Sequence, residues 1–150
     1  MRNIFDQDNT EELKSRIGQL TPETKGLWGT MEVSQMLAHC CVTYEMAYED
    51  KHKRPSPVLR FFLKLLIKNG VVGEKPYPKN SRTAPGFIIT DKKDFEVEKK
   101  RLLDYVDYTF QLGADHFEGL ESFSFGPITS KEWSNLFYKH LDHHLRQFGV

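Results

Sequence analysis

The chain contains 150 residues, which is the size of one domain with a single hydrophobic core. Apolar residues make up 39% of it and charged residues 28%, a balance that is typical of globular proteins and excludes a fibrous or disordered chain. Lysine and arginine together number 21, as do aspartate and glutamate. Because these charges cancel, no overall electrostatic field attracts the chain to nucleic acid or to an anionic membrane, and we expect neither as a partner.

The cysteines and the apolar segments indicate which cellular compartment the protein occupies. Cys40 and Cys41 are adjacent within a predicted helix, where successive side chains diverge and do not form a disulfide bond. The first residues lack the apolar stretch and cleavage site of a signal peptide. The most apolar segment, residues 58–67, is about half as long as a membrane-spanning helix. We therefore expect a cytoplasmic protein in a reducing environment.

Three helices are predicted in the first half of the chain. Residues 8–20 and residues 31–49 carry apolar side chains at three- and four-residue steps, which is the spacing of one helix face. A third helix, over residues 56–68, begins with a proline, whose missing N–H costs little at that position. It is expected to end at Asn69 and Gly70, since both residue types favour a helix end.

The short helix at residues 56–68 also has a basic amphipathic pattern. Basic residues recur every four positions beside apolar ones: Arg60, Lys64 and Lys68 beside Phe61, Leu65 and Ile67. Such a helix can lie on a membrane or on nucleic acid. A helix at the face of a bundle or of a dimer explains the same pattern, and we favour that interpretation.

The second half begins with a long loop and continues with two helices. Residues 71–89 contain prolines and glycines without helical periodicity, which indicates an irregular loop; within it, residues 86–90 are the only strand candidate. Helices are predicted for residues 90–112 and 129–148, and the second opens with the Thr-x-x-Glu pattern of a capping box. The sequence therefore predicts an all-α fold with residues 1–150 in a single domain. We expect an antiparallel four-helix bundle with an extra short helix and a long irregular loop.

Two histidines in the last predicted helix are the most informative feature. His140 and His144 are four residues apart, so both project from one face of the helix. That face is apolar and carries Trp133, Leu136, Phe137, Leu141 and Phe148. A buried imidazole without a polar partner costs about 1–3 kcal/mol, and a divalent cation bound to both rings supplies that partner. The alternative is that each ring is hydrogen-bonded to a backbone carbonyl or a buried water.

A third ligand is expected from a facing helix. His39 lies at the edge of the apolar stripe of the second predicted helix and is the best candidate. Cys40 could supply a thiolate instead, although its position nearer the centre of the stripe favours a small core residue. His52 lies in a charged stretch and His116 in a predicted loop, so we expect both to face solvent.

These residues resemble the DinB/YfiT-like superfamily, and most closely a branch known only as a domain of unknown function. The resemblance covers nearly the whole chain and is carried by three motifs: WGTM at 28–31, QMLAH at 35–39 and HLDHHLRQF at 140–148. It implies a four-helix bundle that holds a divalent metal ion, typically zinc or nickel, through three imidazoles. Carried over to this chain, the ligands are His39, His140 and His144.

Other positions match or depart from the family. Gln147 matches a glutamine that often follows the second histidine of the pair, and the Phe-Gly-Pro turn at 125–127 also matches. Ser122 and Phe123 stand where the branch is expected to have a His-Pro pair. We do not expect that absent histidine to be a ligand, so the three-histidine assignment is unaffected.

A site with three histidine ligands leaves at least one coordination position open, which is the arrangement of a catalytic metal. The resemblance implies a thiol transferase in which the metal activates a low-molecular-weight thiol toward a small-molecule substrate. One alternative is a metal-dependent hydrolase that uses a metal-bound hydroxide. It needs a general base near the metal, and the sequence places neither Glu45 nor Glu98 there. A second alternative is a non-catalytic metal-binding module, for example a stress-related one. The resemblance also allows a homodimer.

The loop over residues 71–89 could cover such a site. Lys75, Lys79 and Arg82 could bind carboxylates of a thiol or substrate, but for each of them we favour a simple solvated position on the loop. Trp28 and Trp133 are expected to be core aromatics that fix the starts of helices, with a place in the wall of a pocket as the less favoured alternative.

Overall fold

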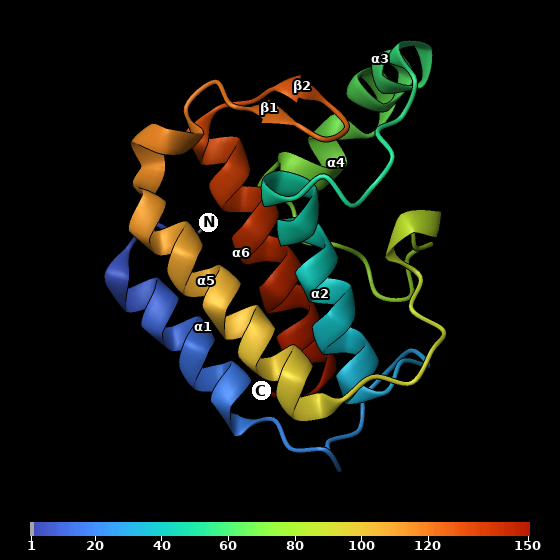
Figure 1. Cartoon of the computed structure of the whole chain (residues 1–150), viewed down its shortest axis with the longest axis vertical. Coiled ribbons are helices and arrows are strands. Elements are labelled where there is room, and N and C mark those ends of the chain that lie inside the picture. The colour runs from blue at the N-terminus through green and yellow to red at the C-terminus, as the bar shows by residue number, and fades with distance from the viewer. Residues whose placement is uncertain (1) are drawn as a thin grey trace.

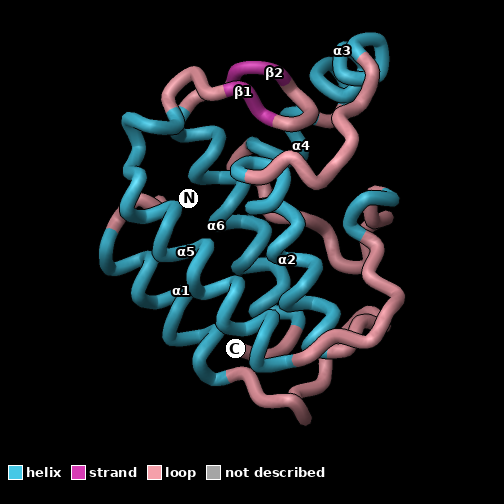
Figure 2. The backbone as a smooth tube through the Cα atoms, in the orientation of Figure 1, coloured by secondary structure: helices cyan, strands magenta, loops and turns pink. Residues whose placement is uncertain are grey.

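The computed structural model describes residues 2–150, and this part of the chain is mostly helical (Figures 1 and 2). Its α-helices are α1 (Gln7–Gln19), α2 (Val33–Tyr48), α3 (Pro57–Leu66), α4 (Lys68–Val72), α5 (Phe95–Phe117) and α6 (Ser130–Gln147). A short 3-10 helix covers Pro85–Phe87, and two antiparallel strands, β1 (Glu121–Ser122) and β2 (Gly126–Pro127), form a small hairpin. The predicted predominance of helix is confirmed.

Side-chain caps explain where several helices begin. Asp6, Ser56 and Asp94 accept hydrogen bonds from backbone N–H groups in the first turns of α1, α3 and α5. Thr129 and Glu132 form the predicted capping box of α6, in which each side chain satisfies a backbone N–H that the helix leaves free. These local bonds fix the starting points from which the helices present their apolar faces.

The four long helices α1, α2, α5 and α6 lie side by side, and α5 and α6 each contact both α1 and α2 (Figure 1). Their apolar faces meet in one core, whose largest fully buried side chains include Trp133, Tyr44, Phe117 and Phe137. The segment between α4 and α5 runs beside α2 (Figure 2), and its 3-10 helix contacts α2. This arrangement places the middle of α2 opposite the second half of α6.

The structure corrects several predicted element positions, including the start of α5, which begins at Phe95 rather than at residue 90. The chain does not leave the helical state at Asn69 and Gly70, because α4 runs through both residues. The strand candidate at residues 86–90 is wrong, since the 3-10 helix occupies its start and the strands lie at β1 and β2. Helix α5 continues beyond residue 112 through a kink at Gly113, whose φ of 71° is accessible to glycine at little cost.

Helix α3 differs from the others because none of its residues is buried. It lies apart from the four long helices, next to the β1–β2 hairpin and α4 (Figure 1). Within residues 2–150, no helix is both long and apolar enough to cross a membrane.

Candidate metal centre

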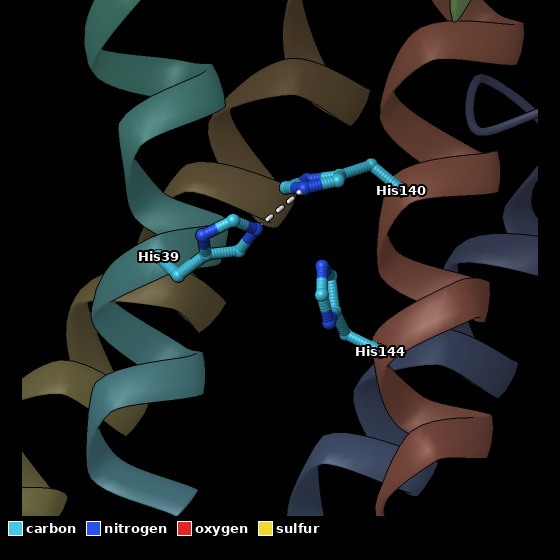
Figure 3. A group of neighbouring side chains, drawn as sticks. All are labelled: His39, His140 and His144. Carbon is cyan, nitrogen blue, oxygen red and sulfur yellow. Dashed lines mark hydrogen bonds between the residues drawn. The ribbon is translucent and has the colours of Figure 1, made fainter. Parts of the chain in front are cut away.

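His39, His140 and His144 converge between α2 and α6, as the sequence predicted (Figure 3). One ligand nitrogen from each ring lies within 4.8 Å of the other two. The closest pair is Nε2 of His39 and Nε2 of His140, which are 3.0 Å apart. His140 and His144 project from successive turns of α6, and His39 reaches toward them from α2. Three residues from two distant parts of the chain therefore form a group that could hold a metal ion.

Hydrogen bonds at the far side of each ring set the direction of its free nitrogen. Nδ1 of His39 donates to the backbone carbonyl of Phe87 at 2.8 Å. Nδ1 of His144 donates to Oε1 of Gln147 at 2.8 Å. Because these acceptors are oxygens, both rings carry their proton on Nδ1 and present an Nε2 lone pair to the centre.

The third ring, His140, contacts a group that can either accept or donate a hydrogen bond. Nδ1 of His140 is 3.0 Å from the hydroxyl of Thr43, which can accept or donate. When the hydroxyl accepts, the Nε2 lone pairs of His39, His140 and His144 all face one another. Three acceptors without a donor repel, and a cation at the centre removes that repulsion. When the hydroxyl donates, His140 carries its proton on Nε2, and this N–H removes the repulsion by donating to Nε2 of His39. His140 can therefore change its tautomer according to whether a metal ion is bound.

Gln147 is itself held in one orientation. Its Nε2 donates to the carbonyl of Trp28 at 2.8 Å, which leaves Oε1 facing His144. Gly29 makes room for this contact, because a Cβ at Gly29 would lie 2.5 Å from Nε2 of Gln147. Gly29 also has a φ of 80°, which a side chain would disfavour. The WGTM segment that carries the family resemblance therefore supports the glutamine that orients His144.

Burial keeps all three rings neutral at physiological pH. It lowers the pKa of His39, lowers the pKa of His140 well below its usual range and lowers the pKa of His144 to about 3. The neighbouring imidazoles lower the pKa of His140 and His144 further, because a second positive charge would be repelled. A neutral imidazole is the form that binds a metal ion, so the site is ready to coordinate without first losing protons.

A cavity of about 550 Å³ lies beyond His143 and Tyr77, and none of the three histidines lines it. His143 and Tyr77 form the wall nearest to the site: the ring of His143 lies 5.0 Å from that of His144, and the ring of Tyr77 lies 6.5 Å from that of His140. Trp28 also lines this cavity and is half-buried, so the favoured role as a core aromatic is wrong and the less favoured place in a pocket wall is observed. Trp133, in contrast, is fully buried as predicted.

The cavity wall is rich in cations. Its five basic residues outnumber its two acidic ones; they are Arg2, Arg16, Lys79, Lys139 and Arg146, against Glu12 and Asp142. The ammonium of Lys79 lies over the ring of Trp28, and that of Lys139 lies over the ring of Tyr77. Of the three basic loop residues predicted to cover a site, Lys79 lines this cavity, whereas Lys75 and Arg82 do not.

Other candidate residues do not join the site. The Cys40 thiol is fully buried beside the sulfur of Met36, and burial raises its pKa well above the usual range, so it is a core residue rather than a thiolate ligand. Glu45 and Glu98 are paired with Arg101. His52 was predicted to face solvent, but it is half-buried and contacts Glu45. His116 is exposed as predicted, although it lies in α5 rather than in a loop.

Several residues that contact the three histidines were not identified from the sequence. Thr43 could have been found, because it lies four residues after His39 and therefore on the same helix face. Tyr77 and the carbonyl of Phe87 could not, since they belong to an irregular segment whose path no periodicity encodes. Comparisons with protein-family models, curated proteins and solved structures returned no match. The resemblance to the DinB/YfiT-like superfamily therefore stays a prediction.

Proposed function

We propose that this protein binds one divalent metal ion through Nε2 of His39, His140 and His144. The observation that carries the proposal is the convergence of three neutral imidazoles, two of them with their protons fixed on the opposite nitrogen. Two nitrogen ligands at about 2.0–2.1 Å from a tetrahedral ion lie roughly 3.3 Å apart, close to the separation of His39 and His140. An all-imidazole set suits zinc or nickel, and we propose these as the metals.

The oxygen partners behind the rings support a metal-binding role. Histidine ligands in metal sites usually donate their other N–H to a carboxylate, a carbonyl or another oxygen, which fixes the ring and raises its basicity. Phe87, Gln147 and Thr43 provide these contacts here. A core histidine needs one such partner; it does not need its second nitrogen aimed at two other imidazoles.

We further propose that the protein is a metal-dependent thiol transferase with the four-helix bundle of the DinB/YfiT-like superfamily. A bound divalent ion with an open position would lower the pKa of a thiol and so supply a thiolate. Two features support this proposal: the sequence resemblance, and the adjacent cavity walled by His143 and Tyr77. The ammonium of Lys79 on its wall, which has no carboxylate within 4.0 Å among the described residues, suits a small thiol or substrate that carries a carboxylate.

The hydrolase alternative has less support. Its candidate general bases, Glu45 and Glu98, are held by Arg101, and neither belongs to the three-histidine group. A hydrolase would also need a base within reach of a metal-bound water. The non-catalytic module remains the alternative that a lack of activity would favour.

Metal analysis of the purified protein tests the first part of the proposal. Protein prepared without chelator should contain about one equivalent of zinc or nickel, and His144→Ala should lose most of it. His116→Ala is the matched control, because His116 is exposed on α5 and remote from the group in sequence and position. Full occupancy in a His140→Ala, His144→Ala double variant would contradict the assignment.

An activity screen tests the second part. Metal-loaded protein is combined with a chromogenic aryl halide and, in turn, several cellular thiols; thioether formation releases halide as the thiol proton passes to solvent. The transferase proposal expects turnover that needs both metal and thiol and that His39→Ala abolishes. Ester hydrolysis without thiol would favour the hydrolase, and no turnover with full metal occupancy would favour the non-catalytic module.

A further inference from the structure

Helix α3 exposes a continuous apolar surface. Six large apolar side chains lie on one side of this helix and are at least half exposed: Val58, Leu59, Phe61, Phe62, Leu65 and Leu66. Leu66 is 71% exposed and Leu65 is 67% exposed. Isolated exposed apolar residues are ordinary, but a contiguous patch of this kind on a soluble domain marks an interaction surface.

The polar side of α3 contacts the rest of the protein, and the apolar side therefore points toward solvent. Arg60 binds Glu121 of β1 at 2.5 Å, and Lys68, just beyond the helix, binds Glu132 of α6 at 2.7 Å. Leu63, on the same side as Arg60, packs against the core. The outward apolar face is therefore set by contacts to two other elements, and α3 lies beyond the four long helices (Figure 1).

The segment that carries this face is basic in sequence, since residues 51–73 contain six lysine or arginine residues and no aspartate or glutamate. Four of these cations are paired with carboxylates from outside the segment: Lys51 with Glu49, Arg54 and Arg60 with Glu121, and Lys68 with Glu132. The remainder of the chain is net acidic, since the whole chain has no net charge. Within residues 2–150, no carboxylate lies within 4.0 Å of the exposed ammonium groups of Lys53 and Lys64, so both are available to a partner.

We propose that α3 docks the protein on the surface of an anionic lipid membrane. The phenylalanine and aliphatic side chains would enter the boundary between headgroups and acyl chains, and Lys53 and Lys64 would meet anionic headgroups. A helix of ten residues is too short to cross a bilayer but long enough to lie in its surface. The charge of the segment complements an anionic bilayer, whereas a two-fold pairing of α3 with α3 would bring like-charged segments together.

This proposal replaces two sequence-based expectations, the absence of a membrane partner and a helix at the face of the bundle or of a dimer. A bundle face would bury the apolar side of α3 within the domain, and no residue of α3 is buried. A dimer face is the alternative that the light-scattering measurement below tests. The proposal is independent of the metal site, because α3 contributes no residue to the three-histidine group or to the adjacent cavity.

Vesicle flotation with the full chain tests the proposal. We expect binding to vesicles made of equal parts phosphatidylcholine and phosphatidylserine, little binding to phosphatidylcholine alone, and release as ionic strength rises. A Phe61→Ser, Leu65→Ser double variant should weaken binding at least tenfold. Lys64→Glu should weaken it by roughly tenfold, because it replaces an attraction with a repulsion.

Matched controls separate the α3 face from general surface effects. Leu27→Ser with Val97→Ser removes two exposed apolar side chains elsewhere, and Lys92→Glu reverses an exposed charge elsewhere; both should bind like the unaltered chain. All these side chains are exposed, so circular dichroism should show unaltered folding. Equal binding to both vesicle types overturns the proposal, as does absence of binding to either. A dimer in light scattering that the Phe61→Ser, Leu65→Ser variant converts to a monomer without vesicle binding would assign α3 to a second copy instead.

Discussion

Gln147 connects the metal centre to the rest of the protein through one amide group. Its oxygen accepts a hydrogen bond from His144 while its nitrogen donates to the carbonyl of Trp28. An amide can do both because it carries a donor and an acceptor on one rigid plane. The residue therefore aligns a ligand ring and at the same time anchors the segment that lines the cavity.

Replacing Gln147 with leucine should weaken metal binding without removing a ligand. The Nδ1–H of His144 would lose its acceptor, so the ring would no longer be held with Nε2 toward the centre. Loss of such a supporting contact typically lowers metal affinity by about 10- to 100-fold. Competition with a chromogenic chelator measures the change. Gln111→Leu, at an exposed position of α5, is the control, and an equal loss in both variants would contradict the orienting role.

Acid should destabilise the metal-free protein through its buried imidazoles. In the unfolded chain His144 has a pKa near 6.5, and burial lowers it to about 3 in the folded state. The unfolded state therefore binds more protons below pH 6.5, so burial of this imidazole has no proton-linked cost above that pH and destabilises the folded state increasingly as the pH falls toward 3. Melting temperatures of chelator-treated protein should decline across this window. His144→Gln should decline less, and parallel curves would show that other groups dominate.

At the scale of elements, α4 is held against α6 by side-chain bonds to its backbone. The Lys139 ammonium donates to the carbonyls of Gly70 and Gly73, and Asn135 donates to the carbonyl of Val72. Lys139 is buried, and burial lowers its pKa to about 8. A buried cation stays in place here because backbone oxygens replace its water shell.

Lys139→Met should loosen α4 selectively. The carbonyls of Gly70 and Gly73 would lose a charged donor, and hydrogen bonds to charged groups contribute about 1.5–3 kcal/mol. We expect a loss of about 2 kcal/mol in the free energy of unfolding, with faster amide hydrogen exchange in residues 68–73. Lys131→Met, on an exposed position of the same helix, should change stability by less than about 0.5 kcal/mol. Unchanged exchange in α4 would show that other contacts hold it.

The elements that the sequence predicted well are those defined by apolar periodicity. The four long helices and the His140–His144 pair follow from spacing on a helix face, which one sequence contains in full, whereas His39 was only the best of two candidates for the third position. The path of residues 73–94, the β1–β2 hairpin and the outward face of α3 depend on contacts between segments far apart in the chain. Arg60 with Glu121 and His39 with the Phe87 carbonyl are such contacts, and no local pattern encodes them.

At the scale of the whole molecule, the metal ion would join α2 to α6. Ligand binding to the native state alone adds RT ln(1 + [L]/Kd) to stability, about 2.7 kcal/mol at a hundredfold excess over Kd. We therefore expect a chelator to lower the melting temperature by several degrees and added zinc to restore it. His39→Ala should melt at the same temperature with and without chelator. A chelator effect that persists in this variant would place the stabilising metal elsewhere.

The hydrogen bond between His39 and the Phe87 carbonyl has a consequence for substitutions in the site. One imidazole contacts the metal position through one nitrogen and secures the α4–α5 connection through the other. A substitution at His39 would therefore change two features at once, removing a candidate ligand nitrogen from the site and a hydrogen bond that holds the α4–α5 connection beside α2. Metal affinity and the placement of an otherwise irregular segment share one side chain.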